Sequence, residues 1–309
     1  MNWPPAANSQ VSGLITCLEG VDSGMGRVPS ATPSPGRLLR GLVLATHAGP
    51  TVAVTTAATL LAVAAGVGPA RTALLCLAVL AGQASIGWSN DWLDSGRDRA
   101  VGRADKPVVQ GAVAPSTLRA AALAAASIAV VTSLALGIVP GLLLLVLVAS
   151  GWVYNLGLKR TAASVLPYAT GFGALPAGVV AAAPGTPAAP WWLVGAGAAL
   201  GIAAHFANVA PDLEDDLATG VRGLPHRLGA VPSAVLGALS LGAAAGLLVL
   251  APEGPPSTTG WLVLLVAGPA VVLAALAGSA RFRRAAFPAV MLLTVLIVVL
   301  LVVSGAAVS

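Results

Sequence analysis

The sequence predicts an all-α integral membrane protein with about nine transmembrane helices, and three observations lead to this fold class. The first is composition, because 57% of the 309 residues are hydrophobic and only 9% are charged. The second is that apolar runs of about 20 residues, long enough to span a bilayer, recur along the chain. The third is that these runs are apolar all round, whereas helices of a soluble domain keep a polar face.

Residues 1–36 precede these runs and are predicted to form a disordered N-terminal tail. The tail is rich in Pro, Ser and Gly, as in "RVPSATPSPGR" at 27–37, and this composition cannot bury a core. It also lacks the basic start and continuous apolar stretch of a signal peptide. We therefore expect the membrane domain to occupy residues 37–309.

The candidate spans are separated by connections rich in Gly and Pro, such as "GIVPG" and "APGTPAAP". They cover roughly residues 42–65, 71–92, 115–137, 139–157, 163–183, 191–211, 230–250, 259–278 and 286–306. An odd number of spans places the two termini on opposite sides of the bilayer.

The basic residues predict the orientation of the chain, since Lys and Arg concentrate in cytoplasmic loops. Of the 16 Lys and Arg residues, all but Arg71 fall in segments that the nine spans place on one side. The N-terminus is therefore expected in the cytoplasm and the C-terminus outside, in a multi-pass protein of the cell membrane. The isoelectric point near 10.0 does not indicate nucleic-acid binding, because the basic residues are few and lie in small groups between spans. Cys17 and Cys76 indicate neither a metal site nor a disulfide.

The acidic residues are concentrated in two clusters, at the ends of the second and sixth spans. In the first cluster, Asp91, Asp94 and Asp98 are spaced i, i+3 and i+7, which puts three carboxylates on one stripe of a helix. Like charges at this spacing repel one another, and a bound cation would relieve the repulsion. Asn90 adds a neutral oxygen beside them.

The second cluster repeats this pattern in "NVAPDLEDDLATG". Asp212 and Asp216 are spaced i, i+4, Glu214 and Asp215 lie between them, and Asn208 stands four residues before Asp212. Hard oxygen ligands without nearby His or Cys favour Mg²⁺ over zinc. One such cluster is compatible with a solvated loop, whereas two on the same side indicate a metal site that faces the cytoplasm.

These two clusters carry a resemblance to a known family. The first, Asn90-Asp91-x-x-Asp94-x-x-x-Asp98, resembles the NDxxDxxxD signature of the UbiA-type intramembrane prenyltransferases. The second, Asp212-x-x-x-Asp216 within "DLEDDLATGVRGLPHRLG", resembles that family's second aspartate motif. The resemblance covers roughly residues 40 to 305, so residues 37–309 look like one UbiA-like domain.

The resemblance implies a bundle of nine helices around a central cavity, with an isoprenyl diphosphate as donor. Its diphosphate would lie on Mg²⁺ between the motifs, held by the metal-binding and catalytic residues Asp91, Asp94, Asp98, Asp212 and Asp216. Departure of the diphosphate gives an allylic cation that attacks an unknown acceptor, aromatic or lipid-like, within the bilayer.

Further residues are candidates for substrate binding. Those expected to contact the diphosphate or the acceptor are Asn90, Arg97, Arg103, Lys106, Lys159, Asn208, Arg222 and His47. Tyr154 is expected to line the cavity and to stabilise the cation through its ring, although aromatic side chains at span ends also anchor helices at the interface. His205 is expected to line the cavity, and His226 to be a loop residue without a role. Pro211 should kink or start a helix directly before Asp212.

Two other functions stay open at this point. A terpene cyclase of the same family would ionise the same donor, farnesyl or geranylgeranyl diphosphate, but close the cation on its own chain. A transporter is less favoured, because its ion sites would lie near the middle of the membrane and not at the ends of spans.

Overall fold

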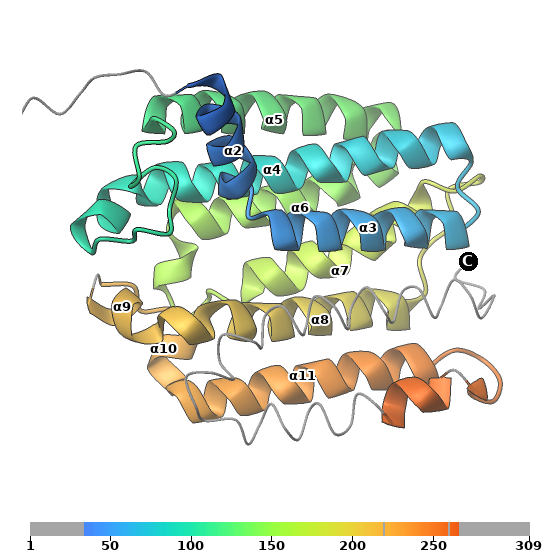
Figure 1. The fold of residues 1–309 in the computed structure, drawn as a ribbon. Helices are drawn as coiled ribbons and strands as arrows, with labels where there is room; N and C mark the ends of the chain where they lie inside the picture. Colours follow the sequence, from blue (N-terminus) through green and yellow to red (C-terminus); the bar gives the residue numbers. More distant parts are fainter. Residues whose placement is uncertain (1–33, 219, 259, 266–309) are drawn as a thin grey trace, which may run out of the picture. The chain divides into compact units, whose positions relative to one another are not determined.

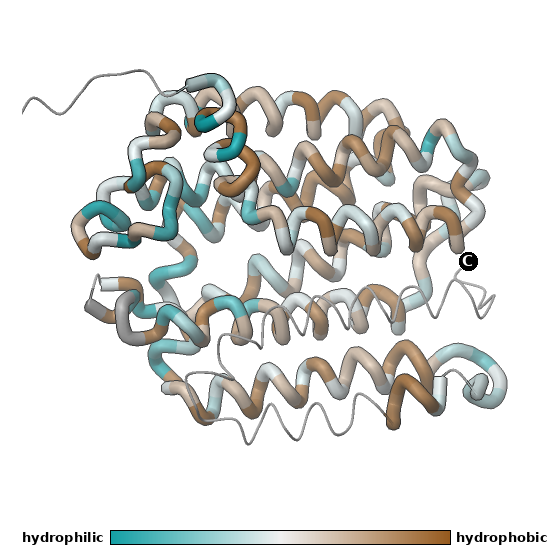
Figure 2. Tube along the Cα trace, in the orientation of Figure 1, coloured by the Kyte–Doolittle hydropathy of each residue, from teal (hydrophilic) through white to brown (hydrophobic). Residues whose placement is uncertain are grey.

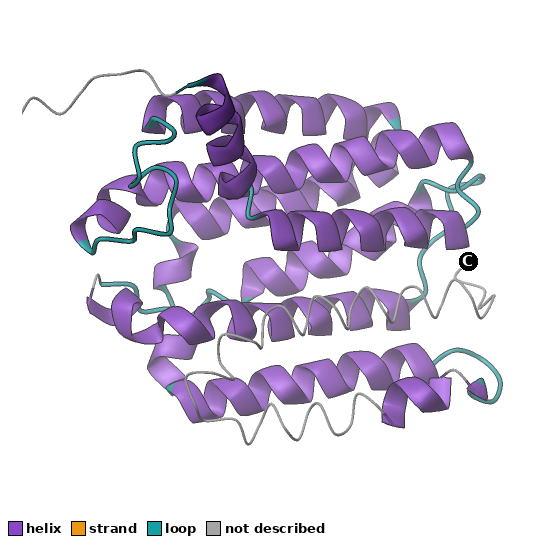
Figure 3. Ribbon diagram, in the orientation of Figure 1, coloured by secondary structure: helices purple, strands orange, loops and turns teal. Residues whose placement is uncertain are grey.

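The computed structural model describes residues 34–218, 220–258 and 260–265, and no strand occurs within these ranges. Figure 1 shows the long helices running side by side, and Figure 3 shows the loops that join them. The elements are α2 (Pro35–Ala45), α3 (Ala48–Ala64), α4 (Pro69–Ala100), α5 (Pro115–Ala135), α6 (Ile138–Leu156), η1 (Leu158–Arg160), α7 (Leu166–Ala181), α8 (Trp191–Val209), η2 (Ala210–Asp212), α9 (Leu213–Ala218), α10 (Leu224–Leu228) and α11 (Ala230–Leu250).

Five of the predicted membrane helices are confirmed within the described residues. Five helices are long and apolar enough to cross a membrane, namely α4, α5, α6, α8 with η2, and α11. The bent pair α2 and α3 would make a sixth, and α7 is a shorter apolar helix. Most of the predicted span 259–278, the whole of 286–306 and most of the predicted tail lie outside the described residues. The predicted number of nine spans therefore stays a prediction.

The first predicted span, 42–65, is broken and not continuous. Helices α2 and α3 meet at an angle of 62°, and His47 between them adopts the left-handed conformation with φ 57°. Gly87 of α4 packs against this break, because a Cβ atom added there would lie 2.5 Å from the backbone oxygen of Thr46. The break therefore brings His47 against α4, where the first acidic motif begins.

Helix α4 extends further than the predicted span 71–92, from Pro69 to Ala100. Pro69 stands in its first turn, where a backbone N–H would have no acceptor within the helix, so proline is tolerated there. The helix continues through the whole first acidic motif and ends before Gly102, whose φ of +67° favours glycine. The motif is therefore helical, as its spacing predicts.

Polar contacts as well as apolar packing hold the helices together. The largest apolar cluster draws on α3, α4, α6, α7, α8 and α11. Asn155 of α6 donates hydrogen bonds to the Ile86 backbone oxygen and to the Ser89 hydroxyl of α4, each at 2.9 Å. Because a low-dielectric interior strengthens such bonds, they fix the register of α6 against α4.

Arg71, the one basic residue predicted on the outer side, has a structural partner at each of two helix ends. Its guanidinium donates to the backbone oxygen of Leu136 at 2.5 Å and to that of Ala182 at 3.0 Å. These residues follow the last turns of α5 and α7, where unpaired carbonyl groups attract a cation. In Figure 2 the hydrophilic segments concentrate at the opposite end, where α4 ends.

Candidate active site

The first acidic motif lies on the last turns of α4 and faces a cavity of about 330 Å³, here called the acidic cavity. Asp91, Asp94 and Asp98 are 1%, 3% and 2% exposed. The cavity is also lined by the other charged side chains Arg97, Arg103, Asp105, Lys106, Lys159, Asp212 and Asp216, together with His47. The structure therefore brings both predicted acidic motifs to one site, with four of the predicted cations.

The first motif is paired with cations that come from other elements. Lys106, in the loop after α4, lies 2.7 Å from an Asp91 carboxylate oxygen, and the His47 ring lies 3.1 Å from the same oxygen. Lys159, on η1, lies 2.5 Å from Asp94 and is itself buried. The sharp turn at Gly157, with φ +158°, starts this short helix at the end of α6.

The second motif begins where α8 changes to a 3₁₀ turn, and Pro211 lies in that turn. Helix α8 ends at Val209, and the chain continues as the 3₁₀ turn η2 and then as α9. Asp212 lies 3.4 Å from Arg103, and Asp216 lies 3.4 Å from Arg97. Arg97 also lies 3.1 Å from Asp94, so one guanidinium joins the two motifs. The side chains of Glu214 and Asp215 are outside the described residues.

The electrostatics of the loops around the cavity follow from these pairs. Burial lowers the pKa of the Lys159 ammonium, and the neighbouring Asp94 carboxylate opposes that shift. Hydrogen bonds to Asp105 raise the pKa of Arg103, and the same bonds lower the pKa of the Asp105 carboxyl. Arg103 is therefore a permanent cation beside Asp212 of the second motif.

The oxygen donors of the cavity suit a hard divalent cation. The Oδ2 atom of Asp98 is buried and has no hydrogen-bond partner among the described residues, so a carboxylate oxygen faces the cavity unused. The described lining residues include six carboxylates and four Lys or Arg side chains, an excess of two negative charges at full ionisation. No group of three or more acidic, His or Cys side chains in the described chain is already gathered as a metal site, because cations lie between the carboxylates.

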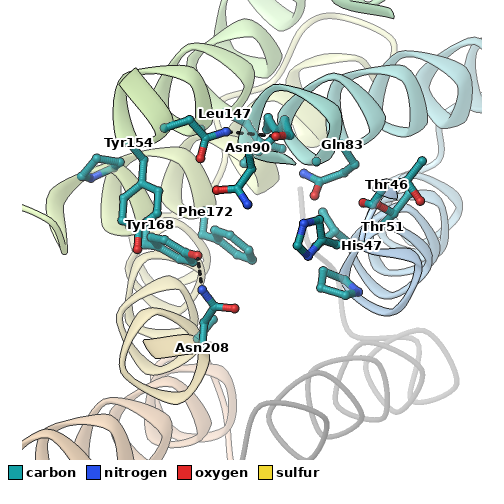
Figure 4. A pocket seen from close by; sticks show the side chains of 18 residues that line it. Thr46, His47, Thr51, Gln83, Asn90, Leu147, Tyr154, Tyr168, Phe172 and Asn208 are labelled. Carbon is teal, nitrogen blue, oxygen red and sulfur yellow. Dashed lines mark hydrogen bonds between the residues drawn. The ribbon is translucent and has the colours of Figure 1, made fainter. Parts of the chain in front are cut away.

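A second cavity of about 150 Å³, here called the central cavity, adjoins the first. The residues that line both are His47, Asn90, Tyr154 and Asn208. Figure 4 shows the rings of Tyr154, Tyr168 and Phe172 on one side of it. The rings of Tyr154 and Tyr168 meet edge to face at 5.2 Å between centroids, and Asn208 donates to the Tyr168 hydroxyl at 3.2 Å.

A third cavity of about 70 Å³, the apolar cavity, is lined almost entirely by carbon. It shares Val54 and Phe172 with the central cavity. Three adjoining spaces therefore lead from charged side chains, past aromatic rings, to an apolar interior.

Two predicted residues lie elsewhere. Arg222 is exposed and does not line the acidic cavity, so its contact with a substrate stays a prediction. His205 is 0% exposed and packs its ring against Tyr154 and Tyr168, while its Nε2 atom lies 3.1 Å from the Ser164 hydroxyl. It lines none of the three cavities described above, and its contacts make it a support for the aromatic side chains.

The prediction that His226 is a loop residue is wrong. It lies in α10, its side chain is 1% exposed, and its Nε2 atom lies 3.2 Å from Asp216. Gln83, Tyr168 and Phe172 were also not predicted from the sequence, although all three line the central cavity. Gln83 had a usable signal, because a polar side chain inside an apolar span marks function more often than structure.

The fold and the cavities define a polytopic helical membrane protein with a charged site at one end of its helices. The profile of the UbiA prenyltransferase family matches residues 51–295, which is most of the chain. The chain therefore belongs to the UbiA prenyltransferase family, and the resemblance seen in the two motifs is confirmed. No curated protein matches the sequence significantly.

Solved structures agree on the fold. The apo structure of a UbiA homologue from Aeropyrum pernix K1 has 20% sequence identity and a TM-score of 0.66, over 82% of this chain and 96% of that one. A UbiA homologue from Archaeoglobus fulgidus, bound to GPP and Mg²⁺, has 16% identity and a TM-score of 0.61, over 87% and 99%. A digeranylgeranylglyceryl phosphate synthase has 12% identity and a TM-score of 0.63, over 87% and 99%.

Proposed function

We propose that the protein transfers an isoprenyl group from an isoprenyl diphosphate to an acceptor inside the membrane, in a reaction that depends on Mg²⁺. The observation that carries this proposal is one cavity that joins both acidic motifs to four cations and adjoins an aromatic and an apolar cavity. UbiA homologues from Archaeoglobus fulgidus bound to GPP or DMAPP together with Mg²⁺ support it.

The net charge of the cavity supports a requirement for metal. At full ionisation the acidic cavity carries an excess of two negative charges, which would repel a diphosphate that arrives without metal. We assign Asp91, Asp94, Asp98, Asp212 and Asp216 as the residues that would hold Mg²⁺. When bound, Mg²⁺ supplies positive charge that stabilises the departing diphosphate.

The basic side chains would bind the diphosphate from several sides. Lys159 and Lys106 now contact Asp94 and Asp91, and Arg97 contacts both motifs. Each of these cations already lines the acidic cavity. It can therefore exchange its carboxylate partner for a phosphate oxygen by a small movement of the side chain. Fixed donors of this kind are worth most where negative charge develops in a site shielded from water.

The polar side chains that line both the acidic and central cavities stand where the reacting carbon would lie. Asn90 and Asn208 would orient the donor, and His47 would contact the diphosphate or the acceptor. Tyr154 presents its ring to the same space, and an aromatic face stabilises a nearby cation. The isoprenyl chain would extend past Phe172 into the apolar cavity, which excludes water.

Terpene cyclisation is the second candidate function, and the aromatic side chains of the central cavity support it. Tyr154, Tyr168 and Phe172 form a continuous set of rings, since Tyr168 and Phe172 also stack at 6.1 Å. Such a surface can stabilise a cation as it moves along its own chain. Incubation with farnesyl or geranylgeranyl diphosphate and Mg²⁺ alone separates the two, because a cyclase releases a hydrocarbon without acceptor.

We place the protein in the cell membrane, with the N-terminus and the acidic cavity on the cytoplasmic side. The basic residues of the loop after α4, of η1 and of α10 support this orientation.

Mass spectrometry of the products tests the proposal. Purified protein would receive a set of isoprenyl diphosphates, Mg²⁺ and membrane lipid, and a prenylated product should appear only with the metal present. Consumption of none of the donors would refute the proposed function.

A further inference from the structure

Gln83 places an amide deep in a membrane helix, on the wall of the central cavity. It stands seven residues before Asn90, close to two helical turns, and therefore about 10 Å further from the acidic motif along α4. Both side chains line the same cavity. Gln83 is thus on the face of α4 that carries the metal-binding motif, but well beyond the reach of the diphosphate.

The amide of Gln83 has no hydrogen bond to any residue in the part of the chain that the structure describes. Neighbouring polar side chains of α4 differ, since Ser85 and Ser89 donate to the backbone oxygens of Gly82 and Ile86. A polar group in an apolar span is costly unless something pairs with it. An amide that lines a cavity and lacks a protein partner indicates a ligand that supplies the partner.

The central cavity has two unlike sides. The aromatic side carries Tyr154, Tyr168 and Phe172, whereas Figure 4 shows Gln83 on the other side, near His47 and away from the rings. The isoprenyl chain suits the aromatic side, which leads to the apolar cavity through Phe172. The side that carries Gln83 is left for the second substrate.

The threonine hydroxyl groups on this side of the central cavity already donate their hydrogens to backbone oxygens. Thr46 donates to the Val43 backbone oxygen at 2.7 Å, and Thr51 donates to the Thr46 backbone oxygen at 2.8 Å. Gln83 therefore offers both a free N–H donor and a free C=O acceptor there.

The charged residues around the central cavity limit the class of ligand that could bind beside Gln83. None of the described residues that line the central cavity is Lys or Arg, and the four cations of the site belong to the acidic cavity. The His47 ring also lines this cavity, but it already lies 3.1 Å from the Asp91 carboxylate, so a carboxylate or phosphate beside Gln83 would be buried without a counter-charge of its own, which is strongly unfavourable. An uncharged group that both donates and accepts, such as a hydroxyl, meets no such cost.

We propose that Gln83 binds the acceptor and selects an uncharged, hydroxyl-bearing molecule over one that carries a carboxylate. This inference rests on the proposed transfer reaction and names its second substrate class. In that transfer the C1–O bond of the donor breaks and a bond from C1 to the acceptor forms. The diphosphate leaves with the bonding electron pair and takes up the proton that the acceptor loses.

The test uses pairs of phenols that differ only in charge, such as para-hydroxybenzoate and its methyl ester, with geranyl and geranylgeranyl diphosphate as donors. The wild-type protein should prenylate the ester at least tenfold better than the acid. Gln83→Leu should raise the KM for the ester about tenfold, as expected for one lost buried hydrogen bond, and leave the KM for the donor unchanged. Gln83→Arg should shift the preference toward the acid.

A matched control is Thr132→Val, which removes a polar group from α5 whose hydroxyl donates only within its own helix. It should leave both KM values unchanged. Preference for the acid, turnover of neither member of any pair, or an unaltered acceptor KM in Gln83→Leu would overturn the inference. Consumption of donor with Mg²⁺ in those cases would leave the ionisation chemistry standing, whereas no consumption would refute the proposed function itself.

Discussion

The contact between His226 and Asp216 yields the sharpest quantitative prediction. An ionised carboxylate can only accept, so the Nε2 atom of His226 must donate across the 3.2 Å that separates them. The His226 side chain is buried, at 1% exposed, and the Asp216 side chain is partly buried, at 17% exposed. We infer that His226 positions Asp216 for metal binding, as residues behind a metal ligand commonly do.

Two amide substitutions separate positioning from simple packing. The amide nitrogen of Gln reaches about as far as Nε2 of His, whereas that of Asn reaches only as far as Nδ1. His226→Gln should therefore keep the bond and His226→Asn should lose it. A hydrogen bond to a buried charge is worth about 1.5–3 kcal/mol, so the Mg²⁺ concentration for half-maximal rate should rise about 10- to 150-fold in His226→Asn.

The assay is the initial rate of diphosphate release at saturating donor, titrated with Mg²⁺ from a metal-free preparation. His226→Gln should stay within about threefold of wild type. Thermal unfolding of the two variants would be measured alongside, since a packing defect lowers the melting temperature of both. Equal Mg²⁺ requirements in the two variants would refute the positioning role.

Three further predictions concern other contacts. Lys159→Met should lower kcat/KM for the donor about 100-fold or more, because the buried cation beside Asp94 is lost, whereas Lys159→Arg should be less affected. Equal single-turnover rates for wild type and Lys159→Met would argue against this role of Lys159. Arg71→Leu should lower the stability by about 2 kcal/mol in thermal unfolding but leave the rate per folded molecule unchanged, since two carbonyl groups lose their donor. Gly87→Ala should destabilise by about 1–3 kcal/mol, because its Cβ would meet the Thr46 backbone, whereas Gly246→Ala, with open space around it, should not.

The charged part of the site could be predicted from the sequence because it depends on local spacing. Asp91, Asp94 and Asp98 share a face on any helix, and the structure adds only that the helix continues through them. Pro211 also predicted the break before Asp212, since proline cannot continue the hydrogen bonding of α8. Local rules were sufficient for these features.

The break between α2 and α3 could not be predicted with the same rules. The apolar character of residues 42–65 continues through the bend, so hydropathy alone indicates one span. The left-handed residue His47 follows Thr46, whose backbone Gly87 of α4 approaches closely, and this tertiary contact is not visible in the local sequence. "HAGP" at 47–50 did contain a Gly and a Pro, which are the local marks of such a break.

The residues missed in the site are distant partners. His226 stands ten residues after Asp216, and this separation does not predict a contact between them. They meet because the chain turns between α9 and α10. Tyr168 and Phe172 are i, i+4 neighbours on α7, and their pattern is the same in a packed core as in a cavity wall.

We propose that the carboxylates of the two motifs hold a metal that binds the diphosphate. Asp94→Asn tests it most directly, because the change removes one charge and almost no volume at a side chain 3% exposed. Glu253→Gln is the matched control, since Glu253 is an exposed carboxylate in the loop after α11. The measurement is Mg²⁺-dependent turnover of an isoprenyl diphosphate by purified protein. Turnover should fall at least about 100-fold in Asp94→Asn and stay unchanged in the control. Full turnover in Asp94→Asn would contradict metal binding by the two motifs.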